Sequence, residues 1–251
     1  MRPHVTFRVL GPLEVLVDGR AVAITAGKVR TVLAALLLQA NRTVTIDGLV
    51  DKLWDEREPR NGRSTVQKYV MRLRHVLDGL GAGHLIGTQP DGYRMSVAPG
   101  QLDLDRFTDL MTSWEQAARR EDTREEAPLL AEALGLWSAV PPMANVPSMT
   151  VQRHEAAGLV ERYLLALDRR IELDLQQGRH SEVLAELIHL TRRYPHRERF
   201  WAHRIRALHR SGRQGEALTV HREVSRLLAD ELGVDPGPEL RSAHQEMLAD
   251  T

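Results

Sequence analysis

The sequence has 251 residues, enough for one large or two modest domains that each bury a core. It contains no cysteine, which excludes disulfide bonds, thiolate catalysis and zinc sites with cysteine ligands. Lys+Arg and Asp+Glu both number 34, and this zero net charge, taken alone, argues against a nucleic-acid binder. There is no run of 18 apolar residues and no signal-peptide core after Met1, so we expect a cytoplasmic protein.

The charge is unevenly distributed along the chain. Residues 1–100 hold 14 Lys/Arg and 9 Asp/Glu, a balance of +5, whereas residues 101–251 hold 20 and 25, a balance of −5. This asymmetry indicates a basic, DNA-facing module joined to an acidic one. We therefore expect two domains, residues 1–100 and 101–251.

Three strand-like runs open the chain. They are rich in β-branched and aliphatic residues and cover 7–10, 13–17 and 21–24. Gly11-Pro12 separates the first two runs, and Asp18-Gly19 is a tight-turn signal between the second and third. The pattern predicts a small antiparallel sheet.

Two helices are predicted next. Apolar residues at helical spacing indicate a helix over 26–39, with Asn41 as its C-cap. The second helix begins after Thr45, a typical N-cap residue, and ends at Trp54. A charged loop over 55–62 follows.

A third helix is predicted over 64–80. Val66, Val70, Leu73 and Leu77 follow the i, i+4, i+7, i+11 spacing of a core-facing stripe. The opposite face carries Ser64, Gln67, Lys68, Met71, Arg72 and His75. Short polar, amide and cationic side chains are those that read base edges and bind phosphates in a major groove. Considered in isolation, however, such a helix is more often only a solvated surface helix.

The segment after this helix predicts a β-hairpin, with strands over 85–88 and 93–97 and a turn at Pro90-Asp91-Gly92. The resulting order is three strands, three helices and a hairpin. That order is typical of a winged helix-turn-helix preceded by an extra sheet, and it favours a recognition helix over a solvated surface helix.

The second half of the chain is predicted to be almost wholly helical, with helices over 104–119, 127–137 and 150–177 and a proline-containing loop over 139–148. Gly178-Arg179 and Gly212-Arg213 lie 34 residues apart, and each pair precedes a similar Glu-x-Leu segment. This spacing is the tetratricopeptide period, and a plain helical bundle is the alternative. The fold class is therefore mainly α with small β-sheets: a winged helix followed by an all-α, tetratricopeptide-like domain.

Motifs for enzymatic chemistry are absent from the sequence. It lacks HExxH, GxxxxGK[ST] and GxSxG, and its 11 histidines form no convincing ligand pair. We expect no metal, no cofactor, no nucleotide switch and no enzymatic activity. No receiver domain precedes the winged helix, so a two-component trigger is not expected either.

Several stretches carry a family resemblance. TVQKYVMRLRHVL and DGYRM resemble the third helix and the end of the wing in OmpR/PhoB-type winged helices. FRVLGPLEV, LLLQANRTVTIDGLVDKLW and LGVDPGPEL make nearly the whole chain similar to the Streptomyces antibiotic regulatory protein family. The resemblance implies that the second half is a bacterial transcriptional activation domain.

Helix geometry and this resemblance together suggest which residues contact DNA bases. Gln67 is expected to pair with adenine, and Lys68 with O6 and N7 of guanine. Met71 can offer only an apolar contact, such as to a thymine methyl group. Family members often have a polar or basic residue at this position, so Met71 departs from the pattern.

Other residues are expected to contact the DNA backbone. The phosphate candidates are Arg63, Ser64, Thr65, Arg72 and Arg74. Thr65 either contacts a phosphate or serves only as a residue at the start of the helix. Arg94 at the wing either contacts the minor groove or its phosphates, or is a strand-edge cation. Trp54 either packs in the core or donates its indole N–H to a phosphate.

The resemblance implies a transcription activator that binds direct repeats near the −35 element as two side-by-side protomers. The helical domain and the 55–62 loop would contact RNA polymerase, its principal sigma factor or its alpha C-terminal domain, with Glu56, Arg57 and Glu58 as candidate contacts. The implied output is expression of an antibiotic or other secondary-metabolite gene cluster. Two alternatives stay open: a tetratricopeptide-type adaptor whose winged helix binds protein, and a repressor with the same DNA chemistry.

Overall fold

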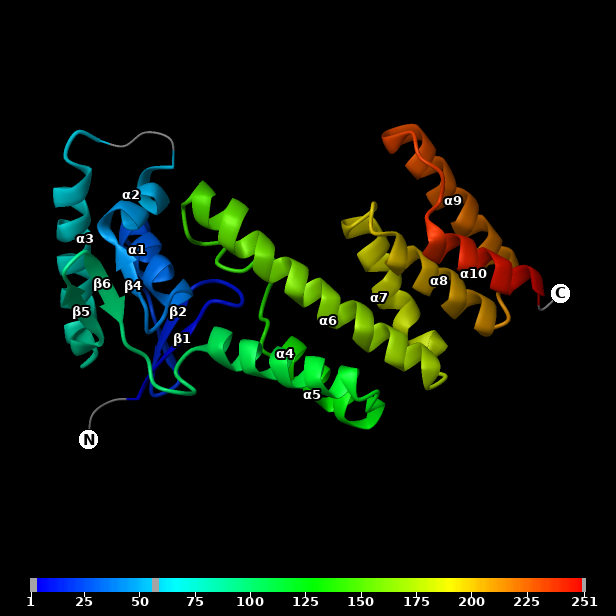
Figure 1. Cartoon of the computed structure of the whole chain (residues 1–251), viewed down its shortest axis with the longest axis horizontal. Helices are drawn as coiled ribbons and strands as arrows, with labels where there is room; N and C mark the ends of the chain where they lie inside the picture. The colour runs from blue at the N-terminus through cyan, green and yellow to red at the C-terminus, as the bar shows by residue number, and fades with distance from the viewer. Residues whose placement is uncertain (1–3, 56–58, 250–251) are drawn as a thin grey trace. The chain divides into compact units, whose positions relative to one another are not determined.

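The computed structural model describes residues 4–55 and 59–249 (Figure 1). By its contacts the chain divides into two compact units, Met1–Leu164 and Leu165–Thr251, here called the N-terminal and C-terminal units. The domain boundary that the sequence predicts after residue 100 is a different division of the chain, and it stays a prediction. In the described part of the chain, no helix combines the length and apolarity needed to span a bilayer.

The N-terminal unit begins with the predicted antiparallel sheet, in the order β1-β2-β3. Its strands are β1 (Val5–Arg8), β2 (Glu14–Val17) and β3 (Arg20–Val22), each beginning within two residues of the prediction. Asp18 and Gly19 have φ angles of 48° and 80°, as a type I′ hairpin turn requires. Phe7 and Val15 are paired and buried, so one face of the sheet packs on the core.

Three helices follow, and they confirm the predicted helix-turn-helix. They are α1 (Gly27–Leu38), α2 (Ile46–Trp54) and α3 (Gly62–Asp78). The predicted stripe of α3, formed by Val66, Val70, Leu73 and Leu77, is fully buried. Thr45 caps α2 as predicted, because its Oγ1 accepts a hydrogen bond from the N–H of Gly48 at 3.1 Å. Gly81, in the left-handed region at φ 72°, follows the end of α3.

Asn41 is not the C-cap of α1, so this prediction was wrong. The helix ends at Leu38 with Gln39 as its C-cap, and Asn41 lies two residues beyond, at φ 64°. The Asn41 amide donates a hydrogen bond to the carbonyl of Val97 at 3.1 Å, and its oxygen accepts one from the Val97 N–H at 3.0 Å. The residue therefore ties the end of α1 to the chain that leaves the wing.

The predicted hairpin forms the wing and gains a third strand. The strands are β4 (Thr43–Thr45), β5 (Ile86–Gln89) and β6 (Gly92–Met95), in the order β4-β6-β5. The short 3-10 helix η1 (Gly83–Leu85) precedes β5. Strand β4 was not predicted, because only Val44 of its three residues is buried and so short a strand shows no periodicity.

The rest of the N-terminal unit is helical. It contains α4 (Asp103–Arg119), α5 (Thr123–Gly135), the π-helical segment η2 (Val151–Ala156) and the start of α6 (Ala157–Gln176). The single helix expected over 150–177 thus begins with a π-helical segment. The proline-containing loop before it is bound to the winged helix. The Asn145 side chain in this loop accepts a hydrogen bond from the Leu13 N–H at 2.7 Å and donates one to the Leu13 carbonyl at 3.1 Å. Just after the loop, the Thr150 N–H donates to the Asp55 carboxylate at 2.8 Å.

Asp103, at the start of α4, also binds the winged-helix part of the N-terminal unit. Its carboxylate accepts hydrogen bonds from the backbone N–H groups of Val9 and Leu10 at 2.9–3.0 Å. Burial raises the pKa of Asp103 from the ordinary 3.8 to about 6, because desolvation outweighs the hydrogen bonds from Leu10 and Val9, which favour the charged form. The charged carboxylate is therefore held in place at a free-energy cost.

A pH-dependent loss of stability follows from Asp103. Because its pKa is higher in the folded than in the unfolded chain, the folded state binds the proton more tightly. The unfolding free energy should fall as pH rises from 3.8 to about 6 and then level off. Asp103→Asn removes this dependence, so the stability advantage of wild type over the variant should be about 2 kcal/mol larger at pH 4.5 than at pH 7. Urea unfolding at both pH values measures the difference, and parallel pH profiles would contradict the burial of this charge.

The C-terminal unit is all-α. After the end of α6 it contains α7 (His180–Arg193), α8 (Glu198–Arg210), α9 (Gln214–Leu232) and α10 (Pro238–Ala249). The two glycines of the predicted repeat occupy equivalent turns, between α6 and α7 and between α8 and α9. Gly178 and Gly212 have φ angles of 81° and 75°. After each, an arginine N–H bonds the carbonyl five residues earlier, at 3.0 and 2.9 Å. The tetratricopeptide-like prediction is confirmed.

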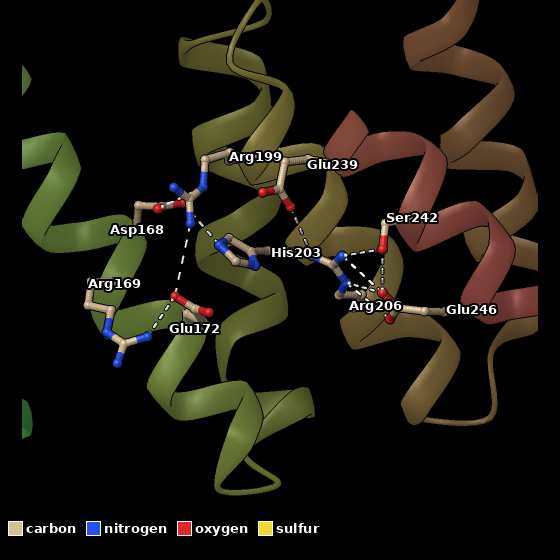
Figure 2. Close-up of polar contacts among 9 residues, drawn as sticks. All are labelled: Asp168, Arg169, Glu172, Arg199, His203, Arg206, Glu239, Ser242 and Glu246. Carbon is tan, nitrogen blue, oxygen red and sulfur yellow. Dashed lines mark hydrogen bonds and ion pairs between the residues drawn. The ribbon is translucent and has the colours of Figure 1, made fainter. Parts of the chain in front are cut away.

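Helix α8 is joined to its neighbours by ion pairs (Figure 2). On one side, the Asp168 carboxylate of α6 contacts Nε2 of His203 at 2.9 Å and Nε of Arg199 at 3.0 Å. On the other side, Arg206 donates to the Glu246 carboxylate of α10 at 2.9–3.1 Å. A cavity of about 290 Å³ lies among these charges. Since each charge drawn is matched by a neighbour, we assign the cluster to holding α6, α8 and α10 together.

Candidate nucleic-acid interface

The third helix presents to solvent the face that the sequence predicts. Ser64, Gln67, Lys68, Met71, Arg72 and His75 are all exposed. They alternate with the buried stripe, because the two sets lie on opposite sides of a 3.6-residue period. Helix α3 thus has one face fixed in the core and one free to enter a groove.

The hydroxyl groups at the start of α3 are used within the helix. The Ser64 and Thr65 hydroxyls both donate to the carbonyl of Asn61, at 3.1 and 2.9 Å. Arg63 forms a bidentate pair with Asp47 of α2 at 2.6 and 3.0 Å, with both side chains about two-thirds exposed. So exposed a pair contributes little stability, which leaves the Arg63 guanidinium able to exchange its partner for a phosphate.

Gln67 and Lys68 lie in the first half of α3. Both are exposed, and within residues 4–55 and 59–249 neither side chain forms a hydrogen bond or an ion pair. Arg72, one turn after Lys68, places its guanidinium 5.7 Å from the ring centre of Tyr69. The Tyr69 ring contacts Trp54 at a centroid distance of 6.4 Å. This face therefore combines free donors with a cation held against an aromatic ring.

Trp54 is half-buried and packs against the core as well as against Tyr69. The ammonium of Lys28 lies 6.0 Å from the centre of the Trp54 ring. These contacts fit the core-packing role, one of the two roles considered for this residue. The alternative role of its indole N–H, donation to a phosphate, stays a prediction.

Arg74 has a structural partner that the sequence did not reveal. Its guanidinium donates to the Ile86 carbonyl at 2.9 and 3.2 Å and to the Thr88 hydroxyl at 2.8 Å, both on β5. It also lies 5.5 Å from the ring centre of Tyr93 on β6. Arg74 therefore joins the recognition helix to the wing, and a phosphate contact would compete with these bonds.

Arg94, on β6, is exposed and stands in register with Thr43 of β4 and Gly87 of β5. Because β6 is the central strand of the wing sheet, the Arg94 backbone is held by β4 on one side and by β5 on the other. The polymerase-contact candidates Glu56, Arg57 and Glu58 lie outside the described residues.

A winged helix with an exposed cationic third helix, followed by tetratricopeptide-like helices, defines a DNA-binding transcriptional regulator. Two family models match the chain in the same order. Residues 19–95 match "Transcriptional regulatory protein, C terminal", and residues 102–248 match "Bacterial transcriptional activator domain".

Individual relatives match almost the whole chain. AfsR of Streptomyces coelicolor is 42% identical over 96% of this chain and 24% of its own length. EmbR of Mycobacterium tuberculosis is 36% identical over 96% of this chain and 63% of its own length. DnrI of Streptomyces peucetius is 34% identical over 95% of this chain and 90% of its own length.

The fold agrees with a solved relative. The structure of Mycobacterium tuberculosis EmbR in complex with a low affinity phosphopeptide has a TM-score of 0.88 and 36% identity, covering 99% of this chain and 66% of that one. The chain belongs to the Streptomyces antibiotic regulatory protein family of transcriptional activators. It spans about a quarter of AfsR and under two-thirds of EmbR.

Proposed function

We propose that this chain is a sequence-specific activator that binds direct repeats near the −35 element and recruits RNA polymerase holoenzyme. The observation that carries the proposal is the exposed pair Gln67 and Lys68 on a helix whose opposite face is fully buried. A recognition helix needs unengaged donors on a rigid support, since donors satisfied elsewhere would have to break bonds before reading a base. The relatives named above make antibiotic or other secondary-metabolite gene clusters the proposed targets.

The roles on DNA divide between bases and backbone. Gln67 and Lys68 read the major groove, while Arg63 and Arg72 bind phosphates at the two ends of this face. Arg94 contacts the minor groove from the wing. Met71 lies on the same face, but it brings no donor or acceptor to a base edge.

Two protomers would bind side by side in head-to-tail order. Direct repeats spaced by about one helical turn, roughly 10–11 base pairs, put both recognition helices on one face of the DNA. The helical domain and the 55–62 loop then face the polymerase, its principal sigma factor or its alpha C-terminal domain. In this proposal the protein works on the nucleoid in the cytoplasm.

Footprinting with and without RNA polymerase holoenzyme tests the proposal. Binding sites are first selected by the full chain from a random-sequence DNA pool and then placed at the −35 position of a weak promoter. We expect two adjacent repeats to be protected, and protection to extend cooperatively across the −35 region when polymerase is added. Protection that excludes polymerase would instead identify a repressor, and failure to select any DNA would favour a protein-binding adaptor.

A further inference from the structure

Met71 belongs to an apolar groove on the N-terminal unit. Its side chain is 68% exposed in the middle of α3, and it lines a cavity of about 560 Å³ between this helix and the segment that joins β3 to α1. The floor of the groove is made by Ile24 and Val29, which are buried, and by the half-buried Val76. The exposed methionine is therefore part of a larger apolar surface and does not stand alone.

The charge at the groove has one sign. None of its nine lining residues is acidic, whereas Arg72 and His75 stand at its edge on α3. Both are exposed, and neither forms an ion pair within the described ranges 4–55 and 59–249. An occupant with an apolar body and one anionic group would satisfy both parts of this surface.

The dimensions favour a small molecule over a helical peptide. The α3 side of the groove runs only from Met71 to Val76, less than two helical turns, whereas a docked helix needs anchors over at least two turns. The volume lies within the range of about 300–1,000 Å³ that small-molecule pockets occupy. Methionine also suits such a site, because its flexible side chain adapts to different apolar shapes.

We propose that this groove binds a small apolar molecule carrying a single anionic group. The apolar body lies on Ile24, Val29, Val76 and Met71, and the anionic group lies at Arg72. Since Met71 and Arg72 belong to the DNA-facing side of α3, the ligand and DNA exclude one another. The ligand would therefore be an inhibitor of DNA binding, and this regulatory consequence rests on the proposed function.

The probe for this test is 1-anilinonaphthalene-8-sulfonate, an apolar body with one sulfonate whose fluorescence rises on binding. We expect Met71→Glu to weaken its binding to the full chain at least tenfold, because the variant removes apolar surface and adds a repelling charge. The matched control is Met149→Glu, which changes a half-exposed methionine outside the groove and should bind the probe as wild type does. Equal binding by wild type and Met71→Glu would overturn the proposal.

Competition with DNA tests the second part. Sodium decanoate should displace the probe, and it should lower the affinity of the wild-type chain for its selected DNA site. The comparison variant is Ala23→Glu, which places a repelling carboxylate in the groove from the segment between β3 and α1 and leaves α3 unchanged. Decanoate should not change the DNA affinity of this variant. Simultaneous binding of decanoate and DNA would overturn the inhibitory role. If the chain selects no DNA yet shows Met71-dependent probe binding, the proposed function fails and the groove assignment stands.

Discussion

Replacing Lys68 by alanine is expected to weaken binding to the selected DNA site between ten- and a hundredfold, without changing thermal unfolding. The Lys68 ammonium has no partner among the described residues, so its removal costs the fold no bond. A cation that donates to guanine in the major groove contributes about 1–3 kcal/mol to discrimination. Gel shifts with the selected site and with single-base variants of it should show the loss concentrated at one guanine.

The matched control for Lys68 is Arg124→Ala, which removes an exposed cation from α5. It should bind DNA as wild type does, because general attraction between a cation and DNA falls off within a Debye length of about 10 Å. Arg72→Ala distinguishes a phosphate contact from a base contact. Loss of a phosphate contact lowers the affinity for all DNA sequences and reduces the slope of log affinity against log salt concentration by about one. If Lys68→Ala and Arg72→Ala both footprint like wild type, the recognition-helix assignment is wrong.

Periodicity predicted those parts of the fold in which burial repeats along one helix. The stripe from Val66 to Leu77 and the exposed set around Lys68 both follow from a 3.6-residue period, and the structure confirms both. The repeat marked by Gly178 and Gly212 could also be predicted from the sequence, because a left-handed turn after a helix favours glycine at a fixed position.

Residues whose partners are distant in the sequence were not predictable in this way. Asn41 was assigned to a helix end because its bonds to Val97 cannot be inferred from neighbouring residues. Arg74 looked like another phosphate contact, because the Ile86 carbonyl that it binds is known only once the wing has folded against α3. Asp103 gave no signal at all, since its partners lie 93 and 94 residues earlier in the chain. Met71, which fitted base reading poorly, gains a context only from the groove beside it.

Replacing Gly92 by alanine is expected to separate the β5–β6 hairpin from β4. A Cβ atom at this position would lie 2.0 Å from the carbonyl oxygen of Val44, 2.8 Å from its carbonyl carbon and 2.9 Å from Cα of Thr45. All three are backbone atoms of β4, the strand that pairs with β6, so none can rotate away as the end of a side chain would. The φ angle of Gly92 is not in the left-handed region, so the whole effect comes from this overlap.

The expected cost of Gly92→Ala is roughly 3 kcal/mol or more in unfolding free energy, because strands β4 and β6 must separate. DNA affinity should fall with it, since Arg94 lies on β6, between β4 and β5, and Arg74 fixes β5 to the recognition helix. The control is Gly87→Ala on the adjacent strand, where a Cβ atom would meet its nearest neighbours at 3.7 and 3.8 Å, an ordinary contact distance. Urea unfolding and gel shifts should therefore separate two glycine substitutions in one hairpin. Equal behaviour of the two variants would show that the β5–β6 hairpin does not pack closely against β4 at Gly92.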